Sequence, residues 1–202
     1  MQPEPAVHVV DDDADVLRSV SFLLRAHRIP ARMHSSASAF LRAEAVGIAG
    51  CVLSDVRMPE MDGIELLRRL RAAGSSLPFI VMTGHADVPL AVEAMKAGAM
   101  DFIQKPCAGE ALLELAGRGL ERWRELSAER ARQADASAGI AVLSKRELAV
   151  LEEVARGKAS KVVAHELGIS VRTVEVHRAN ILAKLGVDNT ASAIAKLVAS
   201  RG

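Results

Sequence analysis

Polar side chains stand at the ends of several apolar runs in the first half of the 202-residue chain. These residues are Asp11, Asp12, Asp55, Thr83 and Lys105. If the apolar runs are parallel strands of one sheet, the polar groups gather along the edge formed by the carboxyl ends of the strands, where such sheets bind ligands. Three carboxylates, one hydroxyl and one ammonium group would then share a small volume.

This combination of groups suits phosphoryl transfer. Carboxylates that lie close together raise one another's pKa, and a hard divalent cation such as Mg²⁺ or Mn²⁺ relieves that repulsion. The cation and Lys105 would neutralise the phosphoryl oxygens, Thr83 would donate a hydrogen bond to them, and Asp55 would be the nucleophile that forms an acyl phosphate. Each residue alone also has an ordinary interpretation: Asp11–Asp13 could be a solvated turn, with Asp13 as a helix cap, and Lys105 could be a surface lysine.

The apolar runs alternate with helical patterns. The expected strands lie at 7–10, 31–34, 51–54, 79–83 and 101–106, and a helical stretch follows each of them. Five strand–helix units in series predict an α/β domain with a doubly wound, five-stranded parallel sheet that is covered on both faces.

The last of these helices begins at Gly109 and keeps an apolar stripe as far as Leu126. Residues 129–139 are polar, rich in Ala and Ser, and end in Gly139. We expect a linker here, either as a continuous helix or as a short coiled coil. A helix that packs on its own domain and then frays is the open alternative.

Residues 143–202 are predicted to be all-α. Start and stop signals mark four helices: Ser144 and Glu147 as a capping box with an end at Gly157, Ser160 to Gly168, Ser170 to Gly186, and a last helix within 189–200. This part carries 10 Lys and Arg against 6 Asp and Glu, a net charge of +4, whereas residues 1–117 carry 11 against 15, a net charge of −4. The pattern favours a helix-turn-helix DNA-binding domain over a helical bundle that binds protein, and both remain open.

Residues 161–186 fit the two-helix core of such a domain. The inward-facing residues are expected to be Val162, Val163 and Leu167 on the first helix and Val174, Ile181 and Leu185 on the second. The outward-facing residues of the second helix would be Arg172, Thr173, Glu175, Val176, Ala179 and Asn180. Basic groups there supply phosphate contacts and groove-facing groups supply specificity, and the carboxylate of Glu175 could accept a hydrogen bond from cytosine N4.

The composition argues against secreted and membrane-spanning classes. The N-terminus has no basic segment followed by an apolar one, and no run approaches the roughly 20 apolar residues that span a bilayer. Cys51 and Cys107 share no short motif spacing, so we expect reduced thiols in a cytoplasmic protein. With only four Phe, one Trp and no Tyr, the core must be aliphatic.

Four motifs, in their order and spacing, resemble the receiver domain of bacterial two-component response regulators: VVDDD, SDVRMPEMDG, VMTGH and AGAMDFIQKP. The resemblance covers residues 6 to about 120 and implies a flavodoxin-like fold. It implies that Asp55 is the phospho-acceptor and that Mg²⁺ is bound by Asp12, Asp55 and the backbone carbonyl of Arg57. Asp11 would support the acidic pocket, and Lys105 would contact the phosphoryl group.

The same resemblance implies a switch pair, Thr83 and Phe102, that senses the phosphoryl group. Arg57 and His85 lie two residues beyond Asp55 and Thr83, near the mouth of the expected site. We hypothesise that they tune the lifetime of the acyl phosphate. Cys107 is a departure, because the family often has Phe after the Lys-Pro pair.

The C-terminal segments LSKRELAVLEEVARG and SVRTVEVHRANILAKLGV resemble the LuxR/NarL-type helix-turn-helix over residues 143–200, and RTVEVHRANI together with MTGHADVPLAVEAMKAGAMDFIQKP resembles the FixJ branch. The resemblance implies a recognition helix at about Val171–Leu185. The implied DNA-binding residues are Lys161 and Lys184 for phosphate and Thr173, Glu175, Val176, His177 and Arg178 for readout, beside the outward-facing Arg172. His177 could instead be a partly buried histidine that bridges the helices. Ser160 stands where the family often has Asn, and it can still cap its helix.

Together these resemblances imply a cytoplasmic, phosphorylation-dependent transcriptional regulator. Its parts would be a receiver domain at 1–120, a helical linker at 121–142 and a helix-turn-helix domain at 143–202. A histidine kinase would phosphorylate Asp55, and the face built by the fourth helix and fifth strand would then form a homodimer that binds promoter DNA, with RNA polymerase as a further partner and no membrane. Catalysis would be limited to Mg²⁺-dependent self-phosphorylation and slow autodephosphorylation.

An aspartyl-phosphate hydrolase is the alternative of another class. Such enzymes also carry an Asp nucleophile on an α/β sheet, and they commonly have a second Asp two residues after it as the acid and base. This chain has Arg57 at that position. The sequence therefore favours the regulator.

Overall fold

The computed structural model describes residues 4–44, 47–84 and 88–201. The chain divides into two compact units, Met1–Leu126 and Ser127–Gly202.

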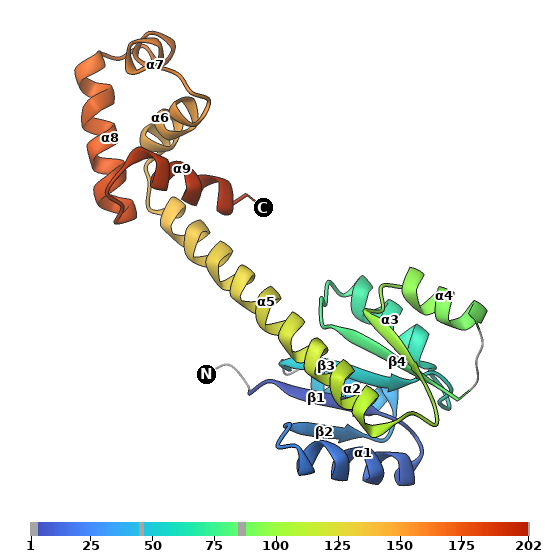
Figure 1. The fold of residues 1–202 in the computed structure, drawn as a ribbon. Helices are drawn as coiled ribbons and strands as arrows, with labels where there is room; N and C mark the ends of the chain where they lie inside the picture. Colours follow the sequence, from blue (N-terminus) through green and yellow to red (C-terminus); the bar gives the residue numbers. More distant parts are fainter. Residues whose placement is uncertain (1–3, 45–46, 85–87, 202) are drawn as a thin grey trace. The chain divides into compact units, whose positions relative to one another are not determined.

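The first unit is built around a parallel sheet. Its strands are β1 (Ala6–Val10), β2 (Ala31–His34), β3 (Gly50–Asp55), β4 (Phe79–Thr83) and β5 (Asp101–Gln104). They lie in the order β2-β1-β3-β4-β5, and every neighbouring pair is parallel (Figure 1). The predicted doubly wound, five-stranded sheet is confirmed. The direction in which strands are added reverses at β1 and β3, which is where sheets of this kind bind ligands.

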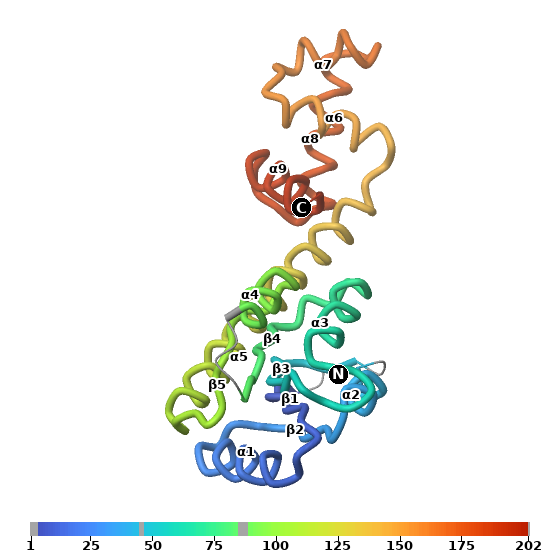
Figure 2. Tube along the Cα trace, turned by 90° about the vertical axis from the view of Figure 1, so that its right-hand side faces the viewer, coloured from blue at the N-terminus to red at the C-terminus, as the bar shows by residue number. Residues whose placement is uncertain are grey.

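Helices cover both faces of this sheet. They are α1 (Ala14–Ala26), α2 (Ala37–Glu44), α3 (Gly63–Ala72), α4 (Val88–Lys96) and α5 (Gly109–Ala141). Side chains of β1 alternate between two cores: Val7 and Val9 pack with α1 and α5, and Val10 packs with α2, α3 and α4. In both views α1 lies beside β2 (Figures 1 and 2). Asp13 caps α1 as predicted, since its side chain accepts hydrogen bonds from the N–H groups of Asp15 and Val16.

A single helix, α5, covers residues 109–141. In the first unit it buries an apolar stripe that includes Leu112, Ala116 and Leu120. Trp123 is partly buried against the core on the α2–α4 side. The stretch predicted as a linker is thus helical as far as Ala141, and the coiled coil stays a prediction.

The second unit contains the four predicted helices after the end of α5. They are α6 (Lys145–Ala155), α7 (Ser160–Leu167), α8 (Val171–Leu185) and α9 (Thr190–Ala199). The capping box of Ser144 and Glu147 is present at the start of α6. A shared apolar core joins the helices through residues such as Val150, Val163 and Ile181.

Two local predictions in this unit are wrong. Val162 is 45% exposed, and Val163 and Ala164 are the buried residues of α7. With 3.6 residues per turn, the face that carries Val163 turns the preceding residue toward solvent. Ser160 does not cap α7: the cap position is Ala159, which makes no side-chain cap hydrogen bond.

Candidate functional site

The strand register brings the predicted site residues of the first unit together. Asp11 follows the residue of β1 that pairs with Ser54, so it lies beside Asp55 at the end of β3. Lys105 follows the residue of β5 that pairs with Thr83 of β4. The carboxyl edge of the sheet therefore carries the acidic groups and the lysine side by side.

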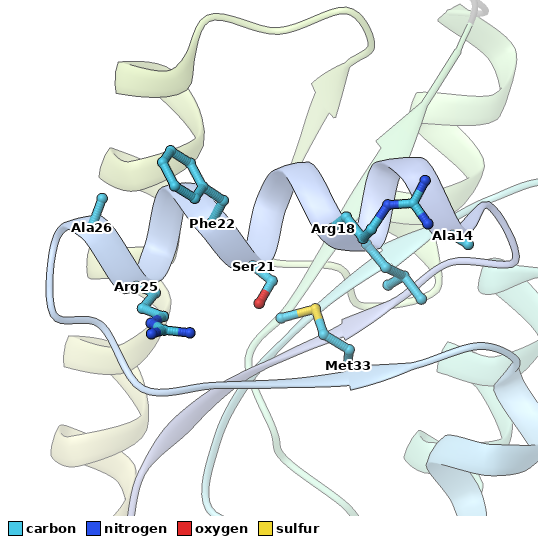
Figure 3. Close-up of a pocket in the computed structure, with 8 residues that line it drawn as sticks. Ala14, Arg18, Ser21, Phe22, Arg25, Ala26 and Met33 are labelled. Atoms are coloured by element: carbon cyan, nitrogen blue, oxygen red, sulfur yellow. The ribbon is translucent and has the colours of Figure 1, made fainter.

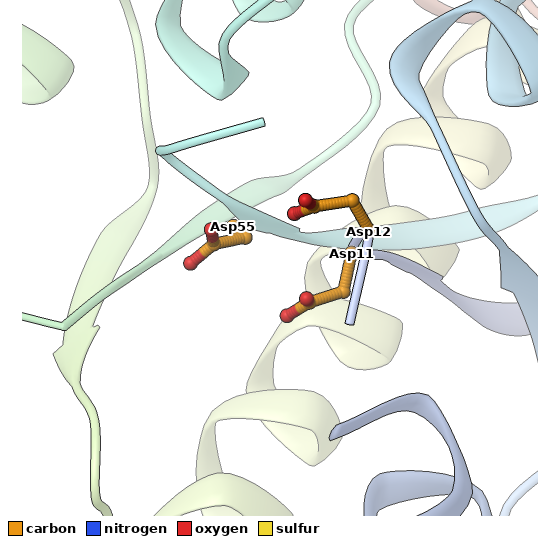
Figure 4. Close-up of side chains that lie close together, drawn as sticks. All are labelled: Asp11, Asp12 and Asp55. Carbon is orange, nitrogen blue, oxygen red and sulfur yellow. The ribbon is translucent and has the colours of Figure 1, made fainter. Parts of the chain in front are cut away.

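Three carboxylates converge at this edge (Figure 4). One oxygen of each of Asp11, Asp12 and Asp55 lies within 4.8 Å of those of the other two. Asp11 and Asp55 are buried, whereas Asp12 is exposed, so the cluster opens to solvent at Asp12. A cluster of carboxylates with access to water fits Mg²⁺, which binds carboxylate oxygens and keeps several of its water molecules.

The ammonium group of Lys105 lies between two of these carboxylates. Its Nζ donates hydrogen bonds to Oδ2 of Asp11 at 2.5 Å and to Oδ1 of Asp55 at 2.8 Å. Its backbone N–H donates to the carbonyl of Thr83 at 2.6 Å, which ties the residue to the end of β4. Burial alone would lower the pKa of Lys105, but the hydrogen bonds to Asp11 and Asp55 raise it above the ordinary value. The lysine is a fixed positive charge in the site.

Asp55 is held from two sides. Burial raises the pKa of its carboxyl group; Lys105 and the N–H of Arg57 oppose this, and Asp11 adds to it. Oδ1 accepts from Lys105, and Oδ2 accepts from the N–H of Arg57 at 3.1 Å. A buried carboxylate in a fixed orientation, beside a cation, is well placed to act as a nucleophile.

The start of α3 packs directly against the end of β3. The N–H of Gly63 donates to the carbonyl of Val56 at 2.9 Å. A Cβ atom at Gly63 would lie 2.2 Å from the backbone oxygen of Asp55, so only glycine permits this approach. Asp62 caps the helix by accepting from the N–H of Glu65 at 2.7 Å. The turn after β3 thus fixes the backbone that carries Asp55.

The remaining residues predicted for the receiver site are Thr83, Phe102, Arg57 and His85. Thr83 is buried at the end of β4, and Phe102 on the adjacent β5 is 45% exposed. Arg57 is exposed and lines a hollow of about 590 Å³ together with Asp12 and Leu90. His85 lies outside the described residues. The switch role of Thr83 and Phe102 and the effect of Arg57 on phosphate lifetime stay predictions.

A second hollow, of about 840 Å³, runs along α1 and Met33 of β2 (Figure 3). Its wall includes Phe22, which is 77% exposed, and the basic side chains of Arg18 and Arg25. Phe22 was not among the residues predicted to be functional. The signal was available, because an apolar residue midway between the buried positions 20 and 24 of one helix must face away from the core.

In the second unit, α8 presents several predicted DNA-binding residues to solvent. The exposed ones are Arg172, Glu175, Val176 and Lys184, together with Lys161 on α7. Thr173 is half-buried, and its hydroxyl shares a hydrogen bond with that of Ser170 at 2.8 Å. His177 is also half-buried, and its Nδ1 has no hydrogen-bond partner among the residues that the structure describes.

Arg178 and Lys184, also predicted to bind DNA, have partners inside the second unit. The guanidinium group of Arg178 donates to Oγ of Ser160 at 2.8 Å and to Oγ1 of Thr190 at 3.2 Å. Nζ of Lys184 donates to Oε2 of Glu147 at 2.8 Å. These contacts cross from α8 to α6, α7 and α9, and nothing in the sequence spacing indicated them.

Glu147 is a buried carboxylate that these contacts satisfy. It is 4% exposed, and Oε2 accepts from Lys184 and from the N–H of Ser144 at 2.7 Å. These two hydrogen bonds lower the pKa of Glu147 to about 2. The group is therefore ionised and anchors the end of α8 to the start of α6.

A parallel sheet in this strand order, an acidic triad with a lysine at its carboxyl edge, and a second unit with a helix-turn-helix define a response regulator with a DNA-binding output. The chain matches the family "Response regulator receiver domain" over residues 7–116 and the family "Bacterial regulatory proteins, luxR family" over residues 141–197. It belongs to the FixJ-type response regulators, in which these two domains are joined.

Individual relatives agree over most of the chain. The transcriptional regulatory protein FixJ of Azorhizobium caulinodans is 49% identical over 183 residues, which are 89% of this chain and 85% of that protein. FixJ of Rhizobium meliloti is 45% identical over 179 residues, 89% of this chain and 88% of that protein. The solved structure of the response regulator StyR has a TM-score of 0.85 at 38% identity and covers 97% of this chain and 99% of its own. The solved structure of full-length FixJ from B. japonicum has a TM-score of 0.59 at 39% identity. The match covers 99% of this chain and 98% of that one.

The chain is thus a two-component transcriptional response regulator with a phospho-acceptor aspartate site and a LuxR-type DNA-binding domain. Its family consists of transcription regulators rather than classical enzymes. The receiver domain implies a cognate histidine kinase, and the acidic triad is typical of a receiver Mg²⁺ site. Within the described part of the chain, no helix combines the length and apolar character needed to cross a membrane.

Proposed function

We propose that Asp55 accepts a phosphoryl group from a phosphohistidine of the cognate kinase. A carboxylate oxygen of Asp55 attacks the phosphorus atom, the P–N bond breaks, and the imidazole leaves as the P–O bond of the acyl phosphate forms. The observation that carries the proposal is the cluster of three carboxylates, two of which, Asp11 and Asp55, bind one ammonium group, with Nζ of Lys105 2.8 Å from Asp55.

Asp12, Asp55 and the backbone carbonyl of Arg57 would hold Mg²⁺, for which Mn²⁺ can substitute. When bound, the cation neutralises negative charge on the carboxylates and on the transferred phosphoryl group. Asp11 keeps the pocket acidic and holds Lys105 through the 2.5 Å hydrogen bond. The exposed position of Asp12 supports the proposal, because a hydrated ion can reach it.

Lys105 would then donate to the phosphoryl oxygens, and the hydroxyl of Thr83 would donate to them from the end of β4. The movement of Thr83 would be coupled to that of Phe102. Val92 and Met95 on α4 and Phe102 on β5 are large apolar residues that are exposed. We assign to the face built by α4 and β5 the homodimer that forms on phosphorylation, since burying apolar surface in a symmetric contact stabilises a dimer.

The cognate kinase would dock on the hollow along α1. The donor phosphohistidine must reach Asp55, so the kinase must cover surface next to the acidic edge, and α1 begins two residues after Asp12. Phe22 offers an exposed aromatic anchor in that hollow, and aromatic residues of this kind often dominate binding energy.

In the second unit, Lys161, Arg172 and Lys184 would contact phosphates. The face that reads promoter DNA would be formed by Thr173, Glu175, Val176 and His177, with Arg178 beside it. Arg172, Glu175 and Val176 are exposed on one helix, which supports a groove-facing surface. RNA polymerase would be a further partner at the promoter. The domains would be the receiver at 1–120, the linker at 121–142 and the DNA-binding domain at 143–202, working in the cytoplasm, where the chromosome lies.

Phosphate incorporation tests this function. The full chain is incubated with acetyl phosphate and Mg²⁺, and intact mass spectrometry measures the added phosphoryl group. We expect one group on the wild type and on Asp62→Asn, which keeps its helix cap, and none on Asp55→Asn or after Mg²⁺ is removed with a chelator. Incorporation that persists in Asp55→Asn would refute the assignment.

A further inference from the structure

We propose that Arg178 is a positioning residue for DNA binding, which acts through the hydroxyl groups of Ser160 and Thr190 and does not touch DNA itself. The inference rests on the proposed DNA-binding role of the second unit. In this proposal Arg178 contacts neither a base nor a phosphate. Its guanidinium group instead joins α8 to α7 and α9 by hydrogen bonds to Ser160 and Thr190, an arrangement that we call the bracket.

The geometry of the guanidinium group carries the argument. Nη1 donates to Oγ of Ser160 at 2.8 Å, and Nη2 donates to Oγ1 of Thr190 at 3.2 Å. Ser160 is the first residue of α7 and Thr190 is the first residue of α9. One planar group thus ties α8 to the starts of two other helices. Nη1 also lies 3.4 Å from Oε1 of Glu175, one turn back on α8.

The chemistry of arginine determines what the two hydroxyl groups can do. Arginine has donors and no acceptor, so both hydroxyl oxygens must accept from it. Each hydroxyl keeps its own proton, and neither donates to any residue that the structure describes. Both protons are therefore available to an acceptor outside the protein, and phosphate oxygens of DNA are acceptors of that kind.

The same contacts remove Arg178 from the surface that could read bases. Its side chain is 34% exposed, whereas Arg172 on the same helix is an exposed residue that makes no hydrogen bond or ion pair with any described residue. To reach DNA, Arg178 would have to leave two hydroxyl partners and the carboxylate of Glu175. Ser160 is the first residue of α7 and Ala159 holds the cap position, so the hydroxyl of Ser160 makes no cap hydrogen bond and accepts from Arg178.

Loss of a phosphate contact and loss of the bracket should change the salt dependence of DNA binding differently. A cation that contacts phosphate releases counterions, so removing it lowers the slope of log K against log salt by about 1. Neutral hydroxyl donors release none. Arg178→Gln should therefore weaken binding on the order of tenfold, with the slope unchanged. Arg172→Gln removes the same charge from the same helix and should lower the slope.

The probe is the duplex that the wild-type full chain, treated with acetyl phosphate, selects from a random-sequence library, with a scrambled duplex of equal composition beside it. Fluorescence anisotropy over a range of salt concentrations gives K and the slope for wild type, Arg178→Gln and Arg172→Gln. A slope that falls by about 1 in Arg178→Gln overturns the inference. If the wild type does not distinguish the two duplexes, the proposed promoter-binding function fails instead.

Two further variants separate positioning from loss of folding. In the Ser160→Ala/Thr190→Val background the two hydroxyl partners of Arg178 are gone, so adding Arg178→Gln should change affinity by less than twofold; an undiminished loss overturns the inference. Arg178→Lys keeps the charge but cannot span both hydroxyl groups with one planar fork. It should lose as much affinity as Arg178→Gln, and wild-type affinity in Arg178→Lys would contradict the bracket.

Discussion

If Asp55 is phosphorylated as proposed, Lys105 exchanges one of its hydrogen-bond partners. Its Nζ is shared between Asp11 and Asp55, at 2.5 and 2.8 Å. An acyl phosphate on Asp55 removes the charge of that carboxylate and places new anionic oxygens beside the ammonium group, which form stronger hydrogen bonds with it. Lys105 would therefore form new hydrogen bonds to the phosphoryl group while it keeps its hydrogen bond to Asp11.

Glu147 gives the second unit a stability that depends on pH. Its pKa is lowered from 4.5 to about 2, first by Lys184 and then by the N–H of Ser144. The folded state binds this proton less readily than the unfolded chain does. Its stabilising contribution is therefore complete above pH 4.5 and is lost as the pH falls from 4.5 to about 2.

We expect Glu147→Gln to flatten this part of the stability profile and to be less stable than wild type at pH 7, because Lys184 loses its ionised partner. Urea denaturation followed by the NMR methyl signals of Val150 and Leu151 measures the second unit alone. Glu166→Gln, which alters an exposed carboxylate on α7, should keep the wild-type profile. Equal acid sensitivity in Glu147→Gln and wild type would contradict the account.

Two glycines of α5, Gly117 and Gly119, differ in how much space surrounds them where the helix packs on β3. A Cβ atom at Gly119 would lie 2.8 Å from Sγ of Cys51, whereas one at Gly117 would have nothing within 4 Å. Burial raises the pKa of the Cys51 thiol to about 12, so it is a neutral packing group at this contact.

The two alanine substitutions should change the stability of the first unit in opposite directions. Gly117→Ala should stabilise the first unit by about 0.5–1 kcal/mol through helix propensity. Gly119→Ala should destabilise it by about 1–3 kcal/mol, because the added methyl overpacks the contact with Cys51. Denaturation followed by the fluorescence of Trp123, the one Trp in the chain, measures both. Changes of the same sign would refute this description of the α5 contact.

The proposed docking of the kinase on α1 makes a separate prediction. Phe22→Ala removes an exposed side chain that supports no core, so folding should be unchanged. We expect phosphotransfer from the kinase to slow about tenfold or more, as for an aromatic interface anchor. Phosphorylation by acetyl phosphate, which needs no docking surface, should keep its rate. An equal loss with both donors would place the defect in the acidic site, and no loss with the kinase would refute the docking face.

Some features of this protein can be predicted from the sequence, and others depend on tertiary packing. Asp11, Asp55 and Lys105 were predictable, because each stands at most two residues after an apolar run and parallel strands end at one edge. Val162 was not, since a short helix with three adjacent apolar or small residues offers more than one inward face. The partners of Arg178 come from positions 12 and 18 residues away in sequence, and only tertiary packing brings them together.

At the scale of the whole molecule, the two units have different charge and different partners. Residues 1–117 carry a net charge of −4 and residues 143–202 a net charge of +4, which suits a metal and phosphoryl site in one unit and DNA in the other. In the proposed mechanism, dimerisation of the receiver domain brings two DNA-binding domains together. Two linked DNA-binding domains bind paired half-sites with a raised effective concentration, so a change in receiver self-affinity becomes a change in promoter occupancy.

In the proposed mechanism, phosphorylation of Asp55 drives dimerisation and promoter binding. The most direct measurement is light scattering on the full chain, combined with binding to the selected duplex, with and without acetyl phosphate and Mg²⁺. Wild type should shift toward the dimer mass and bind the duplex on the order of a hundredfold more tightly when phosphorylated, and Asp55→Asn should do neither. A wild type that responds in neither measurement, or an Asp55→Asn variant that responds as wild type does, would contradict the account.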